Sequence, residues 1–430
     1  MGVDSLPPSL IQANPEVFPF LTQLEAEGRL RPIRSCDPPI TIPAWSVITT
    51  GKDPGELGTY GFRNRSSRDY LHYELSFSNR IKYPRIWDNL PEGKKAFVLG
   101  VPQSYPPGSI NGVCISGILT PGLDSKWIEP QSEASRVLEV AGGHYLFDVS
   151  GYRTENRDKL MGELAQMLEQ KDRLISTYLN QDFHLFMSVI IGSDRINHAF
   201  WKYVFEDHPR YEKCERYSDF FWNYYRKLDG LLNKWFQRAQ EHGYRALILS
   251  DHGAKSLRGV FCLNDFLIEK GYLVLKQKVS ENRVLEYSDV NWSKTSLWAD
   301  GGYCGRIYVN KKGREPEGFV ESVEGIYNQL NSDLNILSQA QNIEMNLHKT
   351  SSLYARCAGI APDFILYVGG LDYRCGGRVS SGGLFLAEND TGPDGVNHDF
   401  FGVIAGDLSD FSPNSIQEIY PLIVSFLERD

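Results

Sequence analysis

The chain has 430 residues, of which 41% are hydrophobic and 23% are charged, as in an ordinary globular protein. Its net charge of -9 argues against a broad nucleic-acid surface, which would need a basic patch. No apolar run approaches the ~18 residues of a membrane-spanning helix, so no membrane partner is expected.

The cysteines and the amino end of the chain both indicate the cellular compartment of the protein. The cysteines are odd in number and form no CxxC motif, which favours free thiols in a reducing compartment. The amino end has no signal-peptide pattern, so we expect a cytoplasmic protein. The cysteines are Cys36, Cys114, Cys214, Cys262, Cys304, Cys357 and Cys375.

The first residues, Met1-Gly2-Val3-Asp4, have the pattern of the tail of a buried strand that ends at Asp4. A strand usually needs about 5–6 residues. Either this strand is short, or the true start of the chain lies upstream of Met1.

Short apolar strands alternate with helical patterns along the rest of the chain, which indicates a mostly parallel sheet covered on both faces. In such sheets ligands gather at the carboxyl ends of the strands. Strands are expected at 31–35, 95–101, 183–191, 246–250, 306–310 and 364–368. Helices are expected at 16–28, from Thr41 to Gly51, and at 156–180, 213–242, 316–335 and 414–428.

Thr41 begins the helix that Gly51 ends, and its hydroxyl has two interpretations. It can cap the helix. It can also be a nucleophile placed where the helix amino end binds an anion. Taken alone, the cap is the more common role. Three clusters of acidic and histidine residues far away in the sequence favour the nucleophile instead.

Each cluster lies at a predicted strand end or in a loop there. Asp194 and His198 follow the strand at 183–191 with a spacing of four, which places both on one face of a helical turn. Asp251 and His252 follow the strand at 246–250. His398 follows a loop rich in Gly, Pro and Asp. Each cluster alone could be a helix cap, a packed histidine or a surface loop.

Together with Asp4, these residues provide three carboxylates and three imidazoles around the Thr41 hydroxyl. Two divalent ions about 3.5–4 Å apart would use such a set to bind and polarise a phosphoryl group. Mixed nitrogen and oxygen ligands agree with zinc and also allow manganese.

The order of these motifs resembles the alkaline phosphatase superfamily, on the branch of type I phosphodiesterases and nucleotide pyrophosphatases, and within it the predicted phosphohydrolase or phosphomutase group. The resemblance runs from residue 2 to 406. It rests on MGVDS, PPITIPAWSVITTGKDPGELG, VPQSYPPGSINGVCISG, SDRINH, SDHG with FCLNDFLIEKGYL, IYVNKKGREPEGFV and NHDFFGVIAG.

The resemblance implies a role for each matching residue. Thr41 matches the nucleophile that forms a phosphothreonine intermediate. Ligands of the metal that also binds the Thr41 oxygen are matched by Asp4, Asp251 and His252. Ligands of the second metal are matched by Asp194, His198 and His398. The family usually holds zinc, and sometimes manganese.

The sequence departs from the family pattern beside the nucleophile. Leu57 stands where a histidine is often found. Phe62 stands where nucleotide pyrophosphatases have a phosphate-binding asparagine, and Asn64 is slightly displaced from that position. Phe62, Arg63 and Asn64 are therefore candidate substrate-binding residues, with a solvated surface as the plain alternative for Arg63.

The resemblance implies a single alkaline phosphatase-like catalytic domain over residues 1–430, built as a three-layer α/β/α sandwich. Cap or loop insertions are expected around 52–83, 102–155 and 275–300. The expected function is a metal-dependent phosphohydrolase, of phosphodiesterase or nucleotide pyrophosphatase type, acting on a small phosphorylated molecule. A phosphomutase and a catalytically silent metal-binding protein are the alternatives. A sulfatase is disfavoured, because Thr41 cannot supply the aldehyde nucleophile expected there.

Overall fold

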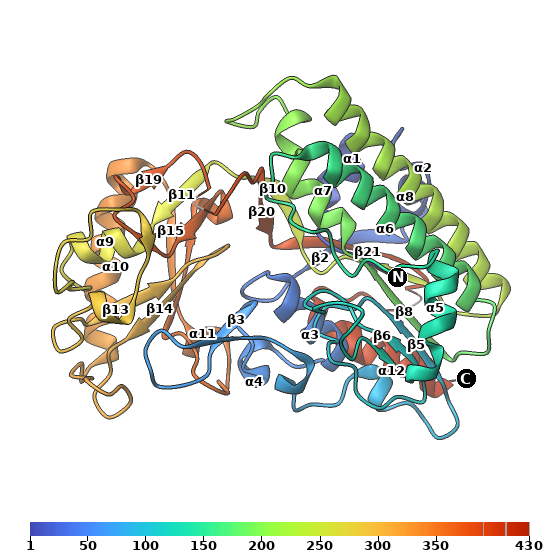
Figure 1. Cartoon of the computed structure of the whole chain (residues 1–430), viewed down its shortest axis with the longest axis horizontal. Coiled ribbons are helices and arrows are strands. Elements are labelled where there is room, and N and C mark those ends of the chain that lie inside the picture. Colours follow the sequence, from blue (N-terminus) through green and yellow to red (C-terminus); the bar gives the residue numbers. More distant parts are fainter. Residues whose placement is uncertain (390, 409–410, 430) are drawn as a thin grey trace. The chain divides into compact units, whose positions relative to one another are not determined.

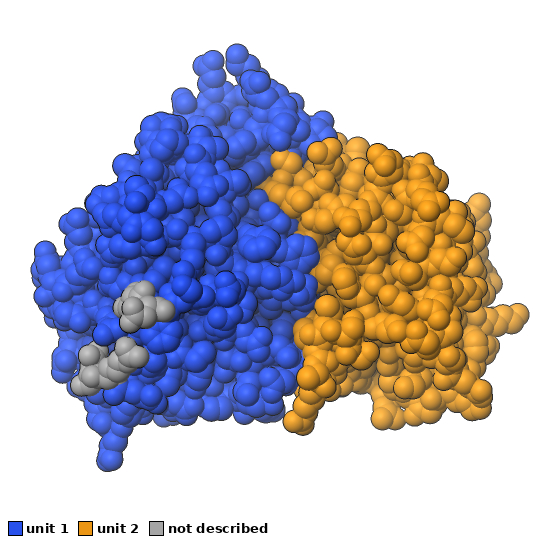
Figure 2. Space-filling view, turned by 180° about the vertical axis from the view of Figure 1, so that it is seen from behind, with its two compact units in different colours: residues 1–61, 76–254, 398–430 blue, residues 62–75, 255–397 orange. Residues whose placement is uncertain are grey.

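The computed structural model describes residues 1–389, 391–408 and 411–429, and its chain is divided between two units. Unit 1 comprises residues 1–61, 76–254 and 398–430, and unit 2 comprises residues 62–75 and 255–397 (Figure 2). The chain leaves unit 1 after Ala254 and returns to it at His398. The predicted single catalytic domain remains a prediction.

Unit 1 is built on an eight-stranded sheet. Its five inner strands, β9, β1, β8, β5 and β6, are parallel to one another, while β2, β21 and β7 are antiparallel additions at the edges. The expected mostly parallel sheet is therefore confirmed. In sheet order, the strands are β2 (Leu30–Arg34), β21 (Phe401–Gly406), β9 (Leu247–Leu249), β1 (Gly2–Val3), β8 (Leu185–Ile190), β5 (Ala96–Leu99), β6 (Gly112–Ile115) and β7 (Ile128–Glu129).

Helices cover both faces of this sheet. Figure 1 shows α6, α7 and α8 on one face and α3 and α12 on the other, which is the expected three-layer arrangement. The helices of unit 1 are α1 (Pro8–Ala13), α2 (Pro19–Ala26), α3 (Thr41–Thr50), α4 (Pro54–Leu57), α5 (Ala134–Ala141), α6 (Arg157–Tyr178), α7 (Gly192–Phe200), α8 (Glu215–Glu241) and α12 (Ile419–Arg429).

Local sequence explains where the main helices begin and end. The Asn156 side chain accepts a hydrogen bond from the Lys159 amide and so caps α6. Gly51 ends α3 in the left-handed region, with φ of 69°, where a residue without Cβ is favoured. Lys171 of α6 is only 4% exposed, and its Nζ lies 5.7 Å from the centre of the Tyr145 ring.

Unit 2 contains a second sheet that the sequence did not predict as such. Its strand order is β13-β14-β16-β17-β11-β19, with β15 paired to β16, and only the β11–β17 pair is parallel. The helices are α9 (Leu263–Glu269), α10 (Val323–Gln341) and α11 (Thr350–Leu353). The sheet strands are β11 (Gly259–Cys262), β13 (Leu297–Asp300), β14 (Gly305–Val309), β15 (Met345–Lys349), β16 (Phe364–Val368), β17 (Tyr373–Gly376) and β19 (Phe385–Leu386). The shorter strands are β3 (Arg63–Arg65), β4 (Tyr73–Leu75), β12 (Arg283–Val284) and β18 (Arg378–Val379). The chain passes from one unit to the other within β10 (Gly253–Ser256) and again within β20 (Val396–Asp399).

A buried ion pair lies in the core of unit 2. The Arg65 guanidinium donates two hydrogen bonds, of 2.9 and 2.7 Å, to the carboxylate of Glu315, and both side chains are fully buried. Arg314 donates a further bond of 2.8 Å to the same carboxylate. The Arg65 guanidinium also lies over the ring of Trp298, so both charges are compensated inside an aromatic core.

Most predicted elements are present, and the differences include the following. Strand β6 lies in a segment expected to be loop, β13 lies in the segment 275–300 expected to be irregular, α1 was not predicted, and α10 begins later than the predicted helix at 316–335. All seven cysteines lie in the described residues, and none of them forms a disulfide bond. Among the described residues, no helix is both long and apolar enough to cross a membrane.

Candidate active site

Parallel pairing brings the predicted acidic residues to one edge of the unit 1 sheet. Asp4 directly follows β1, which lies between β8 and β9. Asp194 is in the first turn of α7, directly after β8, and Asp251 follows β9. Because parallel strands present their carboxyl ends at the same edge, three residues distant in sequence become neighbours there.

Thr41 is the first residue of α3 and is 1% exposed. Ile40 is the N-cap residue, and it makes no side-chain cap hydrogen bond. The Thr41 hydroxyl oxygen lies 3.2 Å from Nε2 of His252, within hydrogen-bond distance. The hydroxyl therefore points into the cluster of acidic residues and histidines at the sheet edge.

The first group of possible ligands consists of Asp4, Asp251 and His252. One ligand atom from each lies within 4.8 Å of the others, and all three residues are fully buried. The Nε2 atom of His252 is 3.6 Å from Oδ1 of Asp4 and 3.2 Å from Oδ2 of Asp251. The structure thus brings together the three residues that the resemblance assigned to one metal.

The second group consists of Asp194, His252 and His398, whose ligand atoms also lie within 4.8 Å of one another. His198 lies beside this group, with Nε2 3.3 Å from Oδ1 of Asp194. The resemblance assigned His198, rather than His252, to the second metal. His252 stacks on His398 with ring centroids 3.8 Å apart, so it borders both groups.

Backbone carbonyls fix the tautomers of two of these histidines. Nδ1 of His252 is 2.9 Å from the carbonyl oxygen of Gly253, and Nδ1 of His398 is 2.8 Å from that of Pro39. A carbonyl oxygen can only accept, so each Nδ1 carries the proton and donates. Each Nε2 therefore presents its lone pair to the carboxylates, as a metal ligand must.

Burial controls the charges in the cluster. Burial lowers the pKa of His252 to about 4 and holds that of His398 well below its ordinary value, so both rings are neutral near pH 7. Burial, reinforced by neighbouring carboxylates, raises the pKa of Asp4 and of Asp251 well above the usual range. Burial would also raise the pKa of Asp194, but His198 and then Arg195 outweigh it and lower that pKa.

Side chains outside the predicted set hold the carboxylates in place. Trp45 donates from Nε1 to Oδ2 of Asp4 over 2.7 Å, and the Ser5 amide donates to Oδ1 of Asp251 over 3.2 Å. Trp45 belongs to the hydrophobic core of unit 1. It is fully buried, and it also orients Asp4.

Arg195 holds Asp194 and was not predicted. It donates from Nη1 to Oδ2 of Asp194 over 2.7 Å, and from Nε and Nη2 to both oxygens of Asp148 over 2.9 and 2.7 Å. Its guanidinium carbon lies 4.5 Å from the centre of the Tyr152 ring. Its position next to Asp194 in the sequence was the available signal for this role. The structure adds that every residue of α7 is buried.

The cluster suits divalent cations on its own chemistry. Oδ1 of Asp4, Oδ1 of Asp194 and Oδ2 of Asp251 are buried and have no hydrogen-bond partner within the described part of the chain. Buried carboxylate oxygens without partners are costly, and a cation between them would compensate that cost. The unprotonated Nε2 atoms of His252 and His398 complete a mixed nitrogen and oxygen set.

The three candidate substrate-binding residues belong to unit 2. Arg63 and Asn64 lie on β3, where the Arg63 carbonyl accepts a hydrogen bond from Arg306 and Asn64 is buried. Phe62 precedes this strand. Their role in substrate binding remains a prediction.

Comparison with solved structures identifies the fold. The structure is similar to that of phosphonoacetate hydrolase from Sinorhizobium meliloti 1021 in complex with phosphonoformate, with a TM-score of 0.57 and 14% sequence identity, over 99% of this chain and 95% of that one. The fold is that of the alkaline phosphatase superfamily, as expected. A comparison with curated proteins finds no match.

The family model is more specific. The chain belongs to the type I phosphodiesterase / nucleotide pyrophosphatase family, whose model matches residues 1–388. The family identifies the chain as a phosphoric ester hydrolase and as a member of a metal-dependent group of enzymes. The resemblance read from the motifs is therefore confirmed.

Proposed function

We propose that the chain hydrolyses a small phosphorylated molecule through a phosphothreonine intermediate on Thr41, with two divalent cations held by the cluster. The observation that carries this proposal is the 3.2 Å approach of the Thr41 hydroxyl to His252, which borders both groups of ligands. A hydroxyl at the amino end of a helix, beside buried carboxylates and neutral imidazoles, suits nucleophilic attack on phosphorus.

Asp4, Asp251 and His252 would hold the cation nearer Thr41, and Asp194, His198 and His398 would hold the other. Zinc is the first expectation and manganese the second. Bound there, such ions supply Lewis-acid polarisation of phosphoryl oxygens and make a hydroxyl a better nucleophile near neutral pH.

The chain's own groups orient the reaction. The Thr41 hydroxyl gives its proton to solvent water and its oxygen forms a bond to phosphorus. The bond from phosphorus to the leaving oxygen breaks, and that oxygen keeps the electron pair. The first amides of α3 would donate to phosphoryl oxygens beside Thr41, because the amino end of a helix carries partial positive charge that favours an anion. Water then cleaves the phosphothreonine, which releases phosphate or a phosphate ester and restores the hydroxyl.

The test compares three purified forms of the full chain. They are the unchanged protein, Thr41→Ala, and Thr50→Ala as a matched control at the other end of the same helix. Each is assayed with an aryl phosphate monoester, an aryl diester, a nucleotide pyrophosphate and phosphonoacetate, and metal content is measured by elemental analysis. Release of phosphate or of a phosphate ester from any of these substrates indicates hydrolysis, whereas a mutase that returns phosphate to the same molecule would release neither.

We expect Thr41→Ala to lose turnover by on the order of 10³-fold or more while it keeps the metal content of the unchanged protein. Thr50→Ala should retain activity. The unchanged protein should carry phosphate on Thr41 when it is quenched during turnover and its peptides are analysed by mass. Undiminished turnover by Thr41→Ala would refute the proposed nucleophile.

A further inference from the structure

A cavity of about 470 Å³ lies within unit 2, and its volume is typical of a site for a small molecule. Every residue that lines it belongs to unit 2, so it shares no residue with the candidate cation cluster. Most of its lining comes from four segments that are far apart in the sequence. They are Arg68 between β3 and β4, residues of 311–315 after β14, residues of 349–351 where β15 meets α11, and residues of 357–364 that lead into β16.

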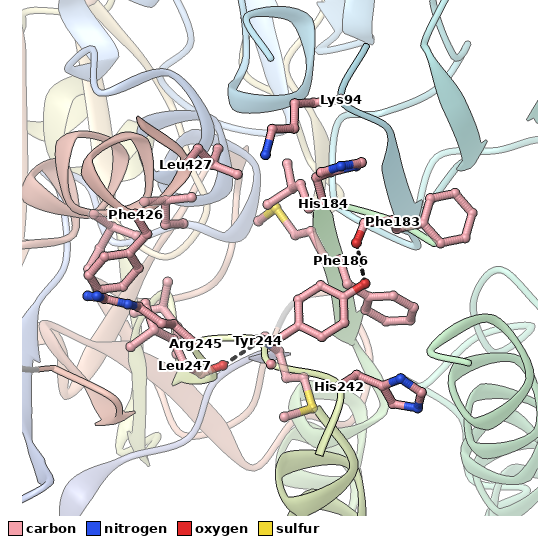
Figure 3. A pocket seen from close by; sticks show the side chains of 18 of the residues that line it. Lys94, Phe183, His184, Phe186, His242, Tyr244, Arg245, Leu247, Phe426 and Leu427 are labelled. Atoms are coloured by element: carbon pink, nitrogen blue, oxygen red, sulfur yellow. Dashed lines mark hydrogen bonds between the residues drawn. The ribbon is translucent and has the colours of Figure 1, made fainter. Parts of the chain in front are cut away.

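The cavity in unit 1 has a different character (Figure 3). It is a gap between the beginnings of β8 and β9, because residues 185–188 pair with β5 and with no other strand of the described chain. Its walls are largely apolar, although Lys94, His184 and Arg245 also line it. In unit 2, by contrast, charged side chains converge on the cavity from separate segments, which is typical of a ligand site.

The acidic side chains of the unit 2 cavity are already compensated. Arg314 donates to both carboxylate oxygens of Asp363, over 2.8 and 2.7 Å, and to Glu315 over 2.8 Å. Glu315 also accepts two hydrogen bonds from Arg65. Because each carboxylate has a guanidinium in contact with it, Glu315 and Asp363 repel a bound anion only weakly.

Two basic side chains of the lining have no such partner. Arg68 and Lys311 are exposed, and neither forms an ion pair with any residue in the described part of the chain. Lys349, by contrast, donates to both oxygens of Glu324, over 2.8 and 2.6 Å. Four basic and two acidic side chains line the cavity, which leaves two positive charges in excess. This local excess attracts an anion although the whole chain has a net charge of -9.

We propose that this cavity binds a small organic phosphate whose phosphoryl group lies between Arg68 and Lys311. A phosphate monoester carries a charge of about -1.5 to -2 near pH 7, which matches the two unpaired cations. The planar guanidinium of Arg68 suits two phosphoryl oxygens, and the exposed hydroxyl of Ser351 is a further donor at the cavity. Val323 and Ile360 offer apolar surface to the carbon body of the ligand.

The test uses phenylphosphonate as the probe, because it has an anionic phosphoryl group and an apolar ring but no ester bond to hydrolyse. Hydrogen–deuterium exchange of the full chain is measured at low salt and mildly alkaline pH over a range of probe concentrations. Protection of the peptide covering 349–364 then gives the affinity of this cavity, separately from any binding at the cation cluster of unit 1.

The variants are Arg68→Ala, Lys311→Ala and the two together, all at exposed positions where the loss of a side chain leaves the core intact. Lys312→Ala is the matched control. Lys312 is the exposed neighbour of Lys311, pairs with Glu321 over 2.6 Å and does not line the cavity.

We expect the probe to protect 349–364 in the unchanged protein and equally in Thr41→Ala, because this cavity does not involve the proposed nucleophile. Arg68→Ala and Lys311→Ala should each weaken binding by about three- to fivefold, and the double variant by about tenfold or more, as is usual for exposed ion pairs. Lys312→Ala should change the affinity by less than about twofold.

Inorganic phosphate, which lacks the ring, should bind at least about threefold more weakly than the probe, because it buries no apolar surface. Absence of protection in 349–364 would overturn the proposal, and so would equal affinity in the Lys311→Ala and Lys312→Ala proteins. Inorganic phosphate that binds as tightly as the probe would also overturn it, since the cavity would then accept a simple ion rather than an organic phosphate.

Discussion

Replacement of Arg195 tests whether the second group of ligands binds a cation. Arg195 and Asp194 are 5% and 1% exposed, and the hydrogen bond of 2.7 Å between them holds Oδ1 of Asp194 toward the histidines. A hydrogen bond to a charged group contributes about 1.5–3 kcal/mol net, which corresponds to roughly 10- to 100-fold in binding. Loss of a group that orients a metal ligand typically lowers metal affinity by the same factor of about 10 to 100.

The charge of Arg195 acts on cation binding in the opposite direction to its hydrogen bond. Arg195 is positively charged and would repel a cation, so its removal could strengthen binding. The bidentate pair with Asp148 offsets that charge locally, with bonds of 2.9 and 2.7 Å. The loss of positioning should therefore dominate. We expect Arg195→Met to weaken the binding of one of the two cations by about 10- to 100-fold.

The assay is a competition titration of the metal-free protein against a chelating dye, with zinc and with manganese. Asp148→Asn keeps the bond from Arg195 to Asp194 but removes the negative charge that Asp148 places beside the guanidinium. It should weaken the same equivalent by a smaller factor, because Asp148 is 30% exposed and water screens its charge. Arg226→Met, on the surface of α8, is the control. Unchanged affinity for both equivalents in a folded Arg195→Met protein would refute the reasoning.

Two further predictions concern stability. Burial lowers the pKa of Lys171 from 10.5 to about 7, so below pH 7 the folded chain carries a buried charge. Lys171→Met should therefore raise the free energy of unfolding by on the order of 3–5 kcal/mol near pH 7. Between about pH 7 and 10.5 the unfolded chain binds the extra proton, so the unchanged protein gains stability as pH rises and the advantage of the variant shrinks. Urea unfolding across this range measures both effects, with exposed Lys213→Met as control, and an advantage that grows with pH would contradict the assignment. In unit 2, Arg65→Met should cost roughly 3 kcal/mol, because Glu315 keeps only its bond from Arg314. Faster hydrogen exchange confined to unit 2 would support this, and unchanged exchange there would contradict it.

Sequence alone could locate most of the candidate site because of one regularity. Asp194 and Asp251 each follow an apolar strand, and Asp4 follows a short one. Parallel strands converge at their carboxyl ends, so polar residues there become neighbours without any knowledge of distances. Thr41 could be placed because Gly51 marks the end of a short helix that begins at the hydroxyl.

The details that sequence could not give depend on the direction of side chains. Adjacency of Asp251 and His252 does not show that the imidazole turns to face Thr41 and both ligand groups. That direction comes from the hydrogen bond of Nδ1 to the Gly253 carbonyl. Arg195 is next to Asp194 in the chain, but only the fold shows that it also reaches Asp148, 47 residues earlier.

The sheet of unit 2 was missed for a different reason. Its strands pair mostly antiparallel, and β11 pairs across long sequence separations, antiparallel with β19 and parallel with β17. Short strands such as Leu297–Asp300 sit in segments without a clear period, since tertiary pairing rather than local pattern determines them.

The electrostatics of the cluster bear on how cations and protons compete for it. Burial, with repulsion between carboxylates, raises the pKa of Asp4 and of Asp251, so the cation-free site retains protons on carboxylates that would be ionised in water. Burial lowers the pKa of His252 to about 4, so that ring needs no deprotonation near neutral pH. A cation that enters must therefore displace protons from carboxylates rather than from this imidazole. Its affinity should then fall on acidification because of Asp4 and Asp251, which reverses the usual expectation that histidine sets the pH dependence of a site with imidazole ligands.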